Sequence, residues 1–146
     1  MADGLAPSFT FVDHTADLAA RLTAETLDGL FEAAAAALMD ALTVRERIEP
    51  REAEPVALAA AEPELLLVDW LNELLFRFEV RGRLVAETSV RVEPRGDGWG
   101  LEAETRGEPR DPVRHPIKVL VKAVTYHGLR IERRNGRYET TIVFDI

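Results

Sequence analysis

The sequence predicts a single α+β domain, residues 1–146, in which two to three helices pack on a mostly antiparallel sheet. Two segments repeat their apolar residues at three- and four-residue steps, the spacing of one face of an amphipathic helix. Two pairs of extended segments are joined by Asp-Gly or Asn-Gly, which are typical of β-hairpin turns. No linker or close repeat interrupts the chain, so these elements are expected to share one core.

The composition excludes several classes of protein. With 47% hydrophobic and 30% charged residues the chain is typical of a globular protein, and no apolar run approaches the roughly 20 residues of a membrane-spanning helix. The absence of cysteine excludes disulfides, thiolate metal sites and thiol nucleophiles. Residues 1–7 lack a secretory pattern, so we expect a cytoplasmic protein without a membrane partner. The net charge of −8 disfavours autonomous RNA or DNA binding, because basic residues that neutralise phosphates dominate such affinity.

The first predicted elements are two extended segments and a helix. Residues 8–13 alternate loosely and predict a strand that runs into a turn at His14-Thr15-Ala16. Residues 18–22 predict a second extended piece at the same edge. The following helix has Thr26 as its N-cap and Asp28 in its first turn. Its apolar stripe comprises Leu27, Leu30, Phe31, Ala34, Leu38 and Leu42.

A second helix is predicted between Pro63 and Gly82. Residues 45–55, which precede it, are charged and contain two prolines, so they indicate a loop or an edge segment before a short strand at 56–60. Pro63 suits a first helical turn, and Gly82 follows the last one. The apolar stripe comprises Leu66, Leu67, Trp70, Leu71, Leu74, Leu75 and Phe78. Three polar residues lie off the centre of this stripe: Asp69, Asn72 and Glu73. The favoured interpretation is that they form a solvated helix face.

The remaining residues predict two hairpins and one ambiguous segment. Residues 84–92 and 99–105 flank Arg95-Gly96-Asp97-Gly98, and residues 129–133 and 137–146 flank Arg134-Asn135-Gly136. Between the hairpins, residues 117–124 fit the period of a helix and that of a strand equally well. Gly128, placed as a C-cap, favours a helix.

A cluster of metal- or proton-binding groups lies within Asp13-His14-Thr15-Ala16-Asp17, and a second pair of carboxylates lies at the other end of the chain. Because Asp145 and Ile146 follow the apolar run 142–144, we expect the chain to end inside its fold, where many C-terminal tails would fray. Our hypothesis is that the two ends meet. Asp17, Asp145, the terminal carboxylate of Ile146 and Asp13 would then offer several oxygen ligands, which suit a hard divalent cation.

Other interpretations of these residues stay open. Asp13 or Asp17 could only cap or turn the backbone, which would leave a purely structural binding module. Asp13 and Asp17 could instead serve a stand-alone metal-dependent phosphohydrolase. However, a Gly-rich phosphate loop and a Gly-x-Ser-x-Gly motif are absent, and the three histidines, His14, His115 and His127, match no zinc spacing. We therefore predict no catalytic residue and interpret the histidines as structural.

The sequence resembles the archease family over nearly its whole length. Five ordered blocks carry the resemblance: Asp13 to Asp17, Thr26 to Phe31, Trp70 to Leu74, Lys122 to Leu129, and Val143 to Ile146. Five blocks in order are far more specific than any one of them. The visible departures lie in the N-terminal extension and in the loops around residues 45–62 and 93–112.

The resemblance implies a protein cofactor rather than an enzyme. Its partner would be the GTP-dependent RNA ligase of the RtcB family, which seals RNA ends in tRNA splicing and RNA repair, and RNA would be met only through that ligase. The family promotes guanylylation and multiple turnover of the ligase and binds a divalent ion, often assigned as calcium. By this resemblance the metal ligands are Asp17, Asp145 and the terminal Ile146, with Asp13 as a candidate beyond the direct ligands.

Overall fold

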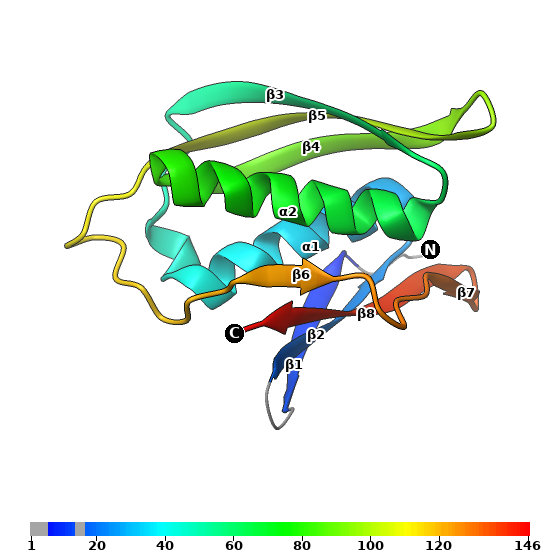
Figure 1. Ribbon diagram of the computed structural model, residues 1–146, viewed down its shortest axis with the longest axis horizontal. Helices are drawn as coiled ribbons and strands as arrows, with labels where there is room; N and C mark the ends of the chain where they lie inside the picture. Colours follow the sequence, from blue (N-terminus) through cyan, green and yellow to red (C-terminus); the bar gives the residue numbers. More distant parts are fainter. Residues whose placement is uncertain (1–5, 14–16) are drawn as a thin grey trace.

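A computed structural model describes residues 6–13 and 17–146, except for the side chain of Asp13 (Figure 1). The predicted turn at His14-Thr15-Ala16 lies outside this part. The larger elements, in chain order, are β1 (Ser8–Asp13), β2 (Asp17–Ala24), α1 (Leu27–Leu42), β3 (Glu52–Ala60), α2 (Pro63–Arg81), β4 (Arg83–Arg95), β5 (Gly98–Pro109), β6 (Ala123–Thr125), β7 (Glu132–Arg134) and β8 (Arg137–Asp145), with a 3₁₀ turn at Arg45–Arg47 after α1.

The two helices lie between two antiparallel sheets (Figure 1). The larger sheet has the strand order β1-β2-β8-β6, and β7 also pairs with β8. The smaller sheet has the order β3-β5-β4. The α+β class, the two helices and the antiparallel pairing are confirmed, but the strands form two sheets rather than one. Among the described residues, no helix is long and apolar enough to cross a membrane.

Helix α1 forms the centre of the core because it contacts strands of both sheets and α2. Its N-cap is the predicted one: the Thr26 hydroxyl accepts a hydrogen bond from the Gly29 N–H at 2.9 Å. The helix is buried on nearly all sides, as expected for a helix that has apolar residues all round. Its run of small alanine side chains lets the neighbouring elements approach closely.

Helix α2 begins and ends as predicted. Pro63 occupies the first turn, and Gly82 caps the C-terminus with a φ of 67°, a left-handed conformation that favours glycine. Trp70 is fully buried, and its indole N–H donates to the Phe31 carbonyl of α1 at 2.9 Å. This bond satisfies the only polar group of the largest core side chain, and it fixes the two helices against each other.

The predicted helix after Pro116 is wrong. Only Ala123–Thr125 is regular there, and it is strand β6. The backbone N–H groups of Lys118 and Lys122, which a helix would use internally, donate instead to Leu42 O at 2.8 Å and Asp145 O at 2.7 Å. Gly128 has a positive φ of 71° in a turn in which the Leu129 N–H donates to the Tyr126 carbonyl at 3.0 Å. It is therefore a turn glycine and not a helix cap.

Both predicted hairpins are confirmed. β4 and β5 pair from Arg83 to Arg95 around a two-residue turn. The β7–β8 turn has Asn135 at φ 55° and Gly136 at φ 73°, the left-handed conformations that an Asn-Gly turn requires. The strand at 56–60 starts earlier than predicted, at Glu52, because the pairing with β5 extends through Pro55 and beyond.

Candidate functional site

The structure brings two of the predicted site residues together. Asp17 is the first residue of β2 and Asp145 the last of β8, and the register of the two antiparallel strands pairs them directly. Side chains of directly opposed residues project to the same face, with Cβ atoms roughly 4.5–5.5 Å apart. Asp17 is half-buried and Asp145 is exposed. Two carboxylates that are far apart in sequence therefore lie together at one end of the β2–β8 strand pair, in the larger sheet.

This carboxylate pair is electrostatically unusual. Like charges directly opposite on neighbouring strands repel each other and destabilise the pair. A bound cation would relieve that repulsion, and carboxylate oxygens are ligands that Ca²⁺ and Mg²⁺ prefer. The donor set of Asp17 and Asp145 thus fits a hard cation in its chemistry.

The described side chains alone do not complete a metal site. Within residues 6–13 and 17–146, no group of three or more His, Asp or Glu side chains is placed to hold an ion. Because Ca²⁺ takes six to eight oxygen ligands, main-chain oxygens and water would have to supply the rest. Ile146 directly follows Asp145 and is 41% exposed, and the ligand role of its carboxyl group stays a prediction.

The role predicted for Asp13 stays a prediction. Asp13 is the last residue of β1, and the register pairs it with Leu18, the neighbour of Asp17, rather than with Asp17 itself. Its side chain and the whole of His14 lie outside the described residues. Of the other histidines, His115 is structural as predicted: it is fully buried, and its Nδ1 accepts from the Asp111 N–H at 2.8 Å.

The C-terminal end of β8 is held from several directions. Phe144 is fully buried and pairs with Leu18 of β2 and Val124 of β6. The Lys122 N–H donates to the Asp145 carbonyl at 2.7 Å, so the backbone of Lys122 lies beside that of Asp145. Lys122 belongs to one of the sequence blocks that resemble the archease family, but nothing in the neighbouring sequence indicated that its backbone would pair with that of Asp145. These contacts prevent the end of β8 from moving away.

The prediction that Asn72 belongs to a solvated helix face is wrong, because its side chain holds the backbone of strand β6. Its side-chain amide donates to the Val124 carbonyl at 3.1 Å, and its oxygen accepts from the Val124 N–H at 3.0 Å. The amide therefore satisfies the backbone groups on the open side of β6, which an edge strand would leave unpaired. Helix α2 fixes β6 in this way, and β6 fixes β8.

A second contact anchors the end of β6 to the start of α2. The Tyr126 hydroxyl donates to a Glu62 carboxylate oxygen at 2.5 Å. This hydrogen bond raises the pKa of Tyr126 above its ordinary value, because it stabilises the protonated phenol and the Glu62 charge disfavours the phenolate.

Comparisons with known proteins identify related sequences. The sequence model described as "Archease protein family (MTH1598/TM1083)" matches residues 9–146. "Protein archease" of Methanopyrus kandleri is 40% identical over 135 residues, which are 92% of this chain and 96% of that protein. "Protein archease" of Thermococcus kodakarensis is 36% identical over 135 residues, 92% of this chain and 95% of that protein.

Two solved structures share the fold. Protein 1598 of Methanobacterium thermoautotrophicum superposes with a TM-score of 0.84 at 30% identity, over 94% of this chain and 98% of that one. A Thermotoga maritima protein described as "an archease, possible chaperone" superposes with a TM-score of 0.62 at 22% identity, over 92% of this chain and 94% of that one. The second likeness concerns the fold alone.

Proposed function

The chain belongs to the archease family, and on this premise we propose that it is the protein cofactor of a GTP-dependent RNA ligase of the RtcB family. In this role it promotes guanylylation of the ligase and allows it to turn over many times in tRNA splicing or RNA repair. The observation that supports the proposal best is the direct pairing of Asp17 with Asp145 where β2 begins and β8 ends.

The carboxylate pair suits an accessory role. Asp17, Asp145 and the carboxyl group of Ile146 would hold a divalent ion, with calcium the expected one. Such an ion supplies positive charge that stabilises the oxygens of a phosphoryl group during transfer. The contribution of this chain is to hold its carboxylates at a fixed edge, because β6 and α2 restrain the end of β8.

Contact with a ligase is geometrically feasible at this edge. Asp145 and Ile146 are exposed, and Asp17 lies next to them in register. A partner could therefore approach the carboxylates without any rearrangement of the core.

The decisive experiment is a ligation assay with a limiting amount of an RtcB-type ligase. RNA with a 2′,3′-cyclic phosphate end and a 5′-hydroxyl end would be in excess, together with GTP and Mn²⁺. We expect about one product per ligase without this protein and many with it, and we expect more guanylylated ligase at early times. Equal product with and without the protein would refute the activator function.

The same reagents test the alternative of a stand-alone phosphohydrolase built on Asp13 and Asp17. The protein alone should neither join RNA nor release phosphate from GTP, because the sequence contains no phosphate loop motif. Sustained phosphate release that Asp17→Asn abolishes would favour the hydrolase instead.

A further inference from the structure

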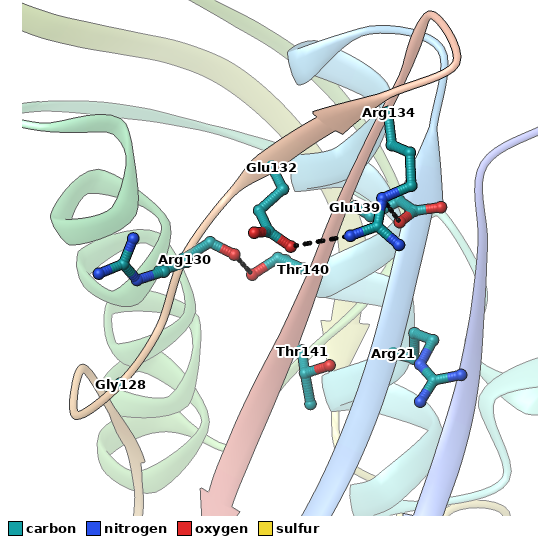
Figure 2. A pocket seen from close by; sticks show the side chains of 8 residues that line it. All are labelled: Arg21, Gly128, Arg130, Glu132, Arg134, Glu139, Thr140 and Thr141. Carbon is teal, nitrogen blue, oxygen red and sulfur yellow. Dashed lines mark hydrogen bonds and ion pairs between the residues drawn. The ribbon is translucent and has the colours of Figure 1, made fainter.

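Strands β6 and β7 have three residues each and pair with opposite ends of β8. β7 pairs with residues 137–139 and β6 with residues 143–145. Between them the chain turns away from β8 at Gly128, and the Thr140 hydroxyl crosses the space by donating to the Arg130 carbonyl at 2.6 Å (Figure 2). β6 therefore forms a separate short ladder at the end of β8, and it needs support from another element.

Helix α2 gives this support on the side of β6 that faces away from β8 (Figure 1). The Asn72 amide donates to the Val124 carbonyl at 3.1 Å and accepts from the Val124 N–H at 3.0 Å. One side chain thus makes the two hydrogen bonds that a neighbouring strand would make to this residue. Because β6 is so short, these bonds are a large share of what keeps it docked on α2, and their loss should let β6 open locally.

The backbone of β6 is joined directly to the part of β8 that carries Asp145. Val124 pairs with Phe144, and both side chains are buried. Ala123 pairs with Asp145 itself, and the Lys122 N–H donates to the Asp145 carbonyl at 2.7 Å. The Asp145 backbone is therefore bound by β2 on one side and by β6 on the other.

The support from β6 matters because of where the carboxylates lie. Asp17 and Asp145 form the last pair of the β2–β8 ladder. The ends of a ladder open more readily than its middle, and the repulsion between two directly opposed carboxylates favours that opening. Pairing with β2 alone is a weak way to hold this end of β8, so the separation of the two carboxylates depends on β6.

We propose that Asn72 is a positioning residue for the cation site, and that cation binding at Asp17 and Asp145 is coupled to the docking of β6 on α2. Since the cation is that of the proposed function, this role of Asn72 rests on that function. Ca²⁺ requires its oxygen ligands at about 2.3–2.6 Å, so a frayed end of β8 binds the ion less tightly than a docked one. Asn72 acts on the ion through the backbone of Val124 and its partners in β8.

The coupling acts in both directions. If a docked β6 strengthens ion binding by some factor, the ion strengthens the docking of β6 by the same factor. An ion at the carboxylate pair therefore stabilises the contact between β6 and α2, which lies on the other side of β6 from β8. This effect on β6 can be measured without any ligase.

The first test is amide hydrogen exchange of the wild-type protein, followed by NMR in EDTA and in saturating calcium. Calcium should slow exchange at the Val124 amide about tenfold, a coupling in the usual range for linked sites. The matched control is the Val92 amide of β4, which also donates to a helix side chain, Asp28 Oδ1 at 2.8 Å, but lies in the smaller sheet. Its local exchange should not change. Equal exchange at Val124 in both conditions, or equal slowing at Val92, would overturn the coupling.

The second test is calorimetric titration of calcium into the wild type and Asn72→Ala. The variant should bind calcium about fivefold more weakly, and by no more than the factor found by exchange, because both report the same coupling. Thr26→Ala is the control for lost stability, since it removes the N-cap bond to the Gly29 N–H near the end of β2 that is distant from Asp17. Its calcium affinity should equal that of the wild type. A residue that only stabilised the fold would lower the melting temperature and leave the affinity unchanged.

The outcomes separate the role of Asn72 from the proposed function. Equal affinity of the wild type and Asn72→Ala, or an equal loss in Thr26→Ala, overturns that role and leaves the carboxylate pair as the cation site. A wild type that binds no calcium removes the cation site and the coupling together, while the turnover assay decides ligase activation separately. If Asn72→Ala does not fold, hydrogen exchange of the wild type decides alone.

Discussion

The two sheets of this molecule use their charged residues in opposite ways. In the smaller sheet, charges neutralise each other: Glu54 of β3 lies 2.8 Å from Arg81, 3.1 Å from Arg77 and 3.2 Å from Arg83, whose side chain is only 4% exposed. In the larger sheet, the carboxylates of Asp17 and Asp145 oppose each other directly.

The difference separates charges that support the fold from charges that are available to a ligand. A compensated cluster is already satisfied by the protein, so an external ion gains little there. An opposed pair such as Asp17 and Asp145 costs stability in the isolated protein, and a cation that binds it recovers that cost. The comparison therefore predicts that mutations in the smaller sheet change stability, whereas mutations in the larger sheet change ion binding.

The largest effect on folding should come from Glu54→Gln. The substitution leaves the buried Arg83 guanidinium next to two other arginines, with the longer 3.8 Å pair to the exposed Glu52 as its remaining ion pair. Removing one partner of a buried pair in this way costs about 3 kcal/mol. Urea denaturation at pH 7 measures this loss. Ligase activation at temperatures well below unfolding should not change, and a loss of activation with normal stability would contradict the division between the sheets.

Acid should remove the same stabilisation from the wild type. Hydrogen bonds from Arg81, with the charges of Arg83 and Arg77, outweigh burial and lower the pKa of Glu54 from 4.5 to about 2. Because the folded pKa lies below the unfolded one, this contribution is complete above pH 4.5 and disappears as the pH falls towards 2. The stability difference between wild type and Glu54→Gln should therefore shrink across that window. A constant difference would mean that Glu54 acts through packing and not through charge.

The next effect concerns metal binding by Asp17→Asn. Calcium at about 100 times its dissociation constant should stabilise the wild type by roughly 2.7 kcal/mol, a rise of several degrees in melting temperature for a domain of this size. The nearly isosteric variant removes one of two opposed charges, so without calcium it should be at least as stable as the wild type. It should gain little from calcium and should not restore ligase turnover. Normal calcium stabilisation would exclude Asp17 from the site.

A tag fused after Ile146 should weaken calcium binding partially. The fusion converts the carboxyl group of Ile146 into a neutral amide and leaves Asp17 and Asp145 in place, so the calcium-dependent melting shift should become smaller without vanishing. Ile146→Ala is the matched control, because it keeps the main-chain carboxylate and should retain the full shift. A tag before Met1 should also have no effect. Equal shifts in both tagged proteins would remove Ile146 from the ligands.

The smallest effect should come from Asn72→Ala. The substitution leaves the N–H and C=O of Val124 without the partners that Asn72 provides, at a cost of about 1–2 kcal/mol. Hydrogen exchange at the Val124 amide should accelerate. Asn72→Asp retains an acceptor for that N–H and should protect it, although the donor to the carbonyl is lost. Unchanged exchange in Asn72→Ala would mean that β8 alone holds β6.

Local signals in the sequence were sufficient for the helices but not for the pairing of all strands. Thr26, Pro63 and Gly82 act on their own neighbouring backbone, so their capping roles could be predicted from adjacent residues. The conformation of the segment that contains β6 could not be predicted in this way, because its partners, Asn72 and β8, are distant in sequence. The division of the strands into two sheets has the same origin, since alternation predicts a strand but not its neighbour.

The candidate site shows the same limit. Asp17 and Asp145 could be predicted to meet because each adjoins an apolar strand pattern near one end of the chain, and the register confirms that they do. Lys122 and Asn72 lack any such pattern, and only the three-dimensional pairing of β6 shows that they support this edge. The metal ligands themselves, with Asp13 and Ile146, stay a prediction.

The position of β8 also has a consequence for biosynthesis. It lies between β2 on one side and β6 and β7 on the other, yet it follows all three in the chain and so leaves the ribosome after them. After β2 has emerged, residues 25–136 must still be translated, which takes several seconds to about twenty seconds at roughly 5–20 residues per second. During that interval the nascent β1–β2 hairpin has an open edge, which is a hazard for misassociation. Asp17 acquires its opposing carboxylate only when translation reaches Asp145, so prematurely terminated chains lack the pair altogether.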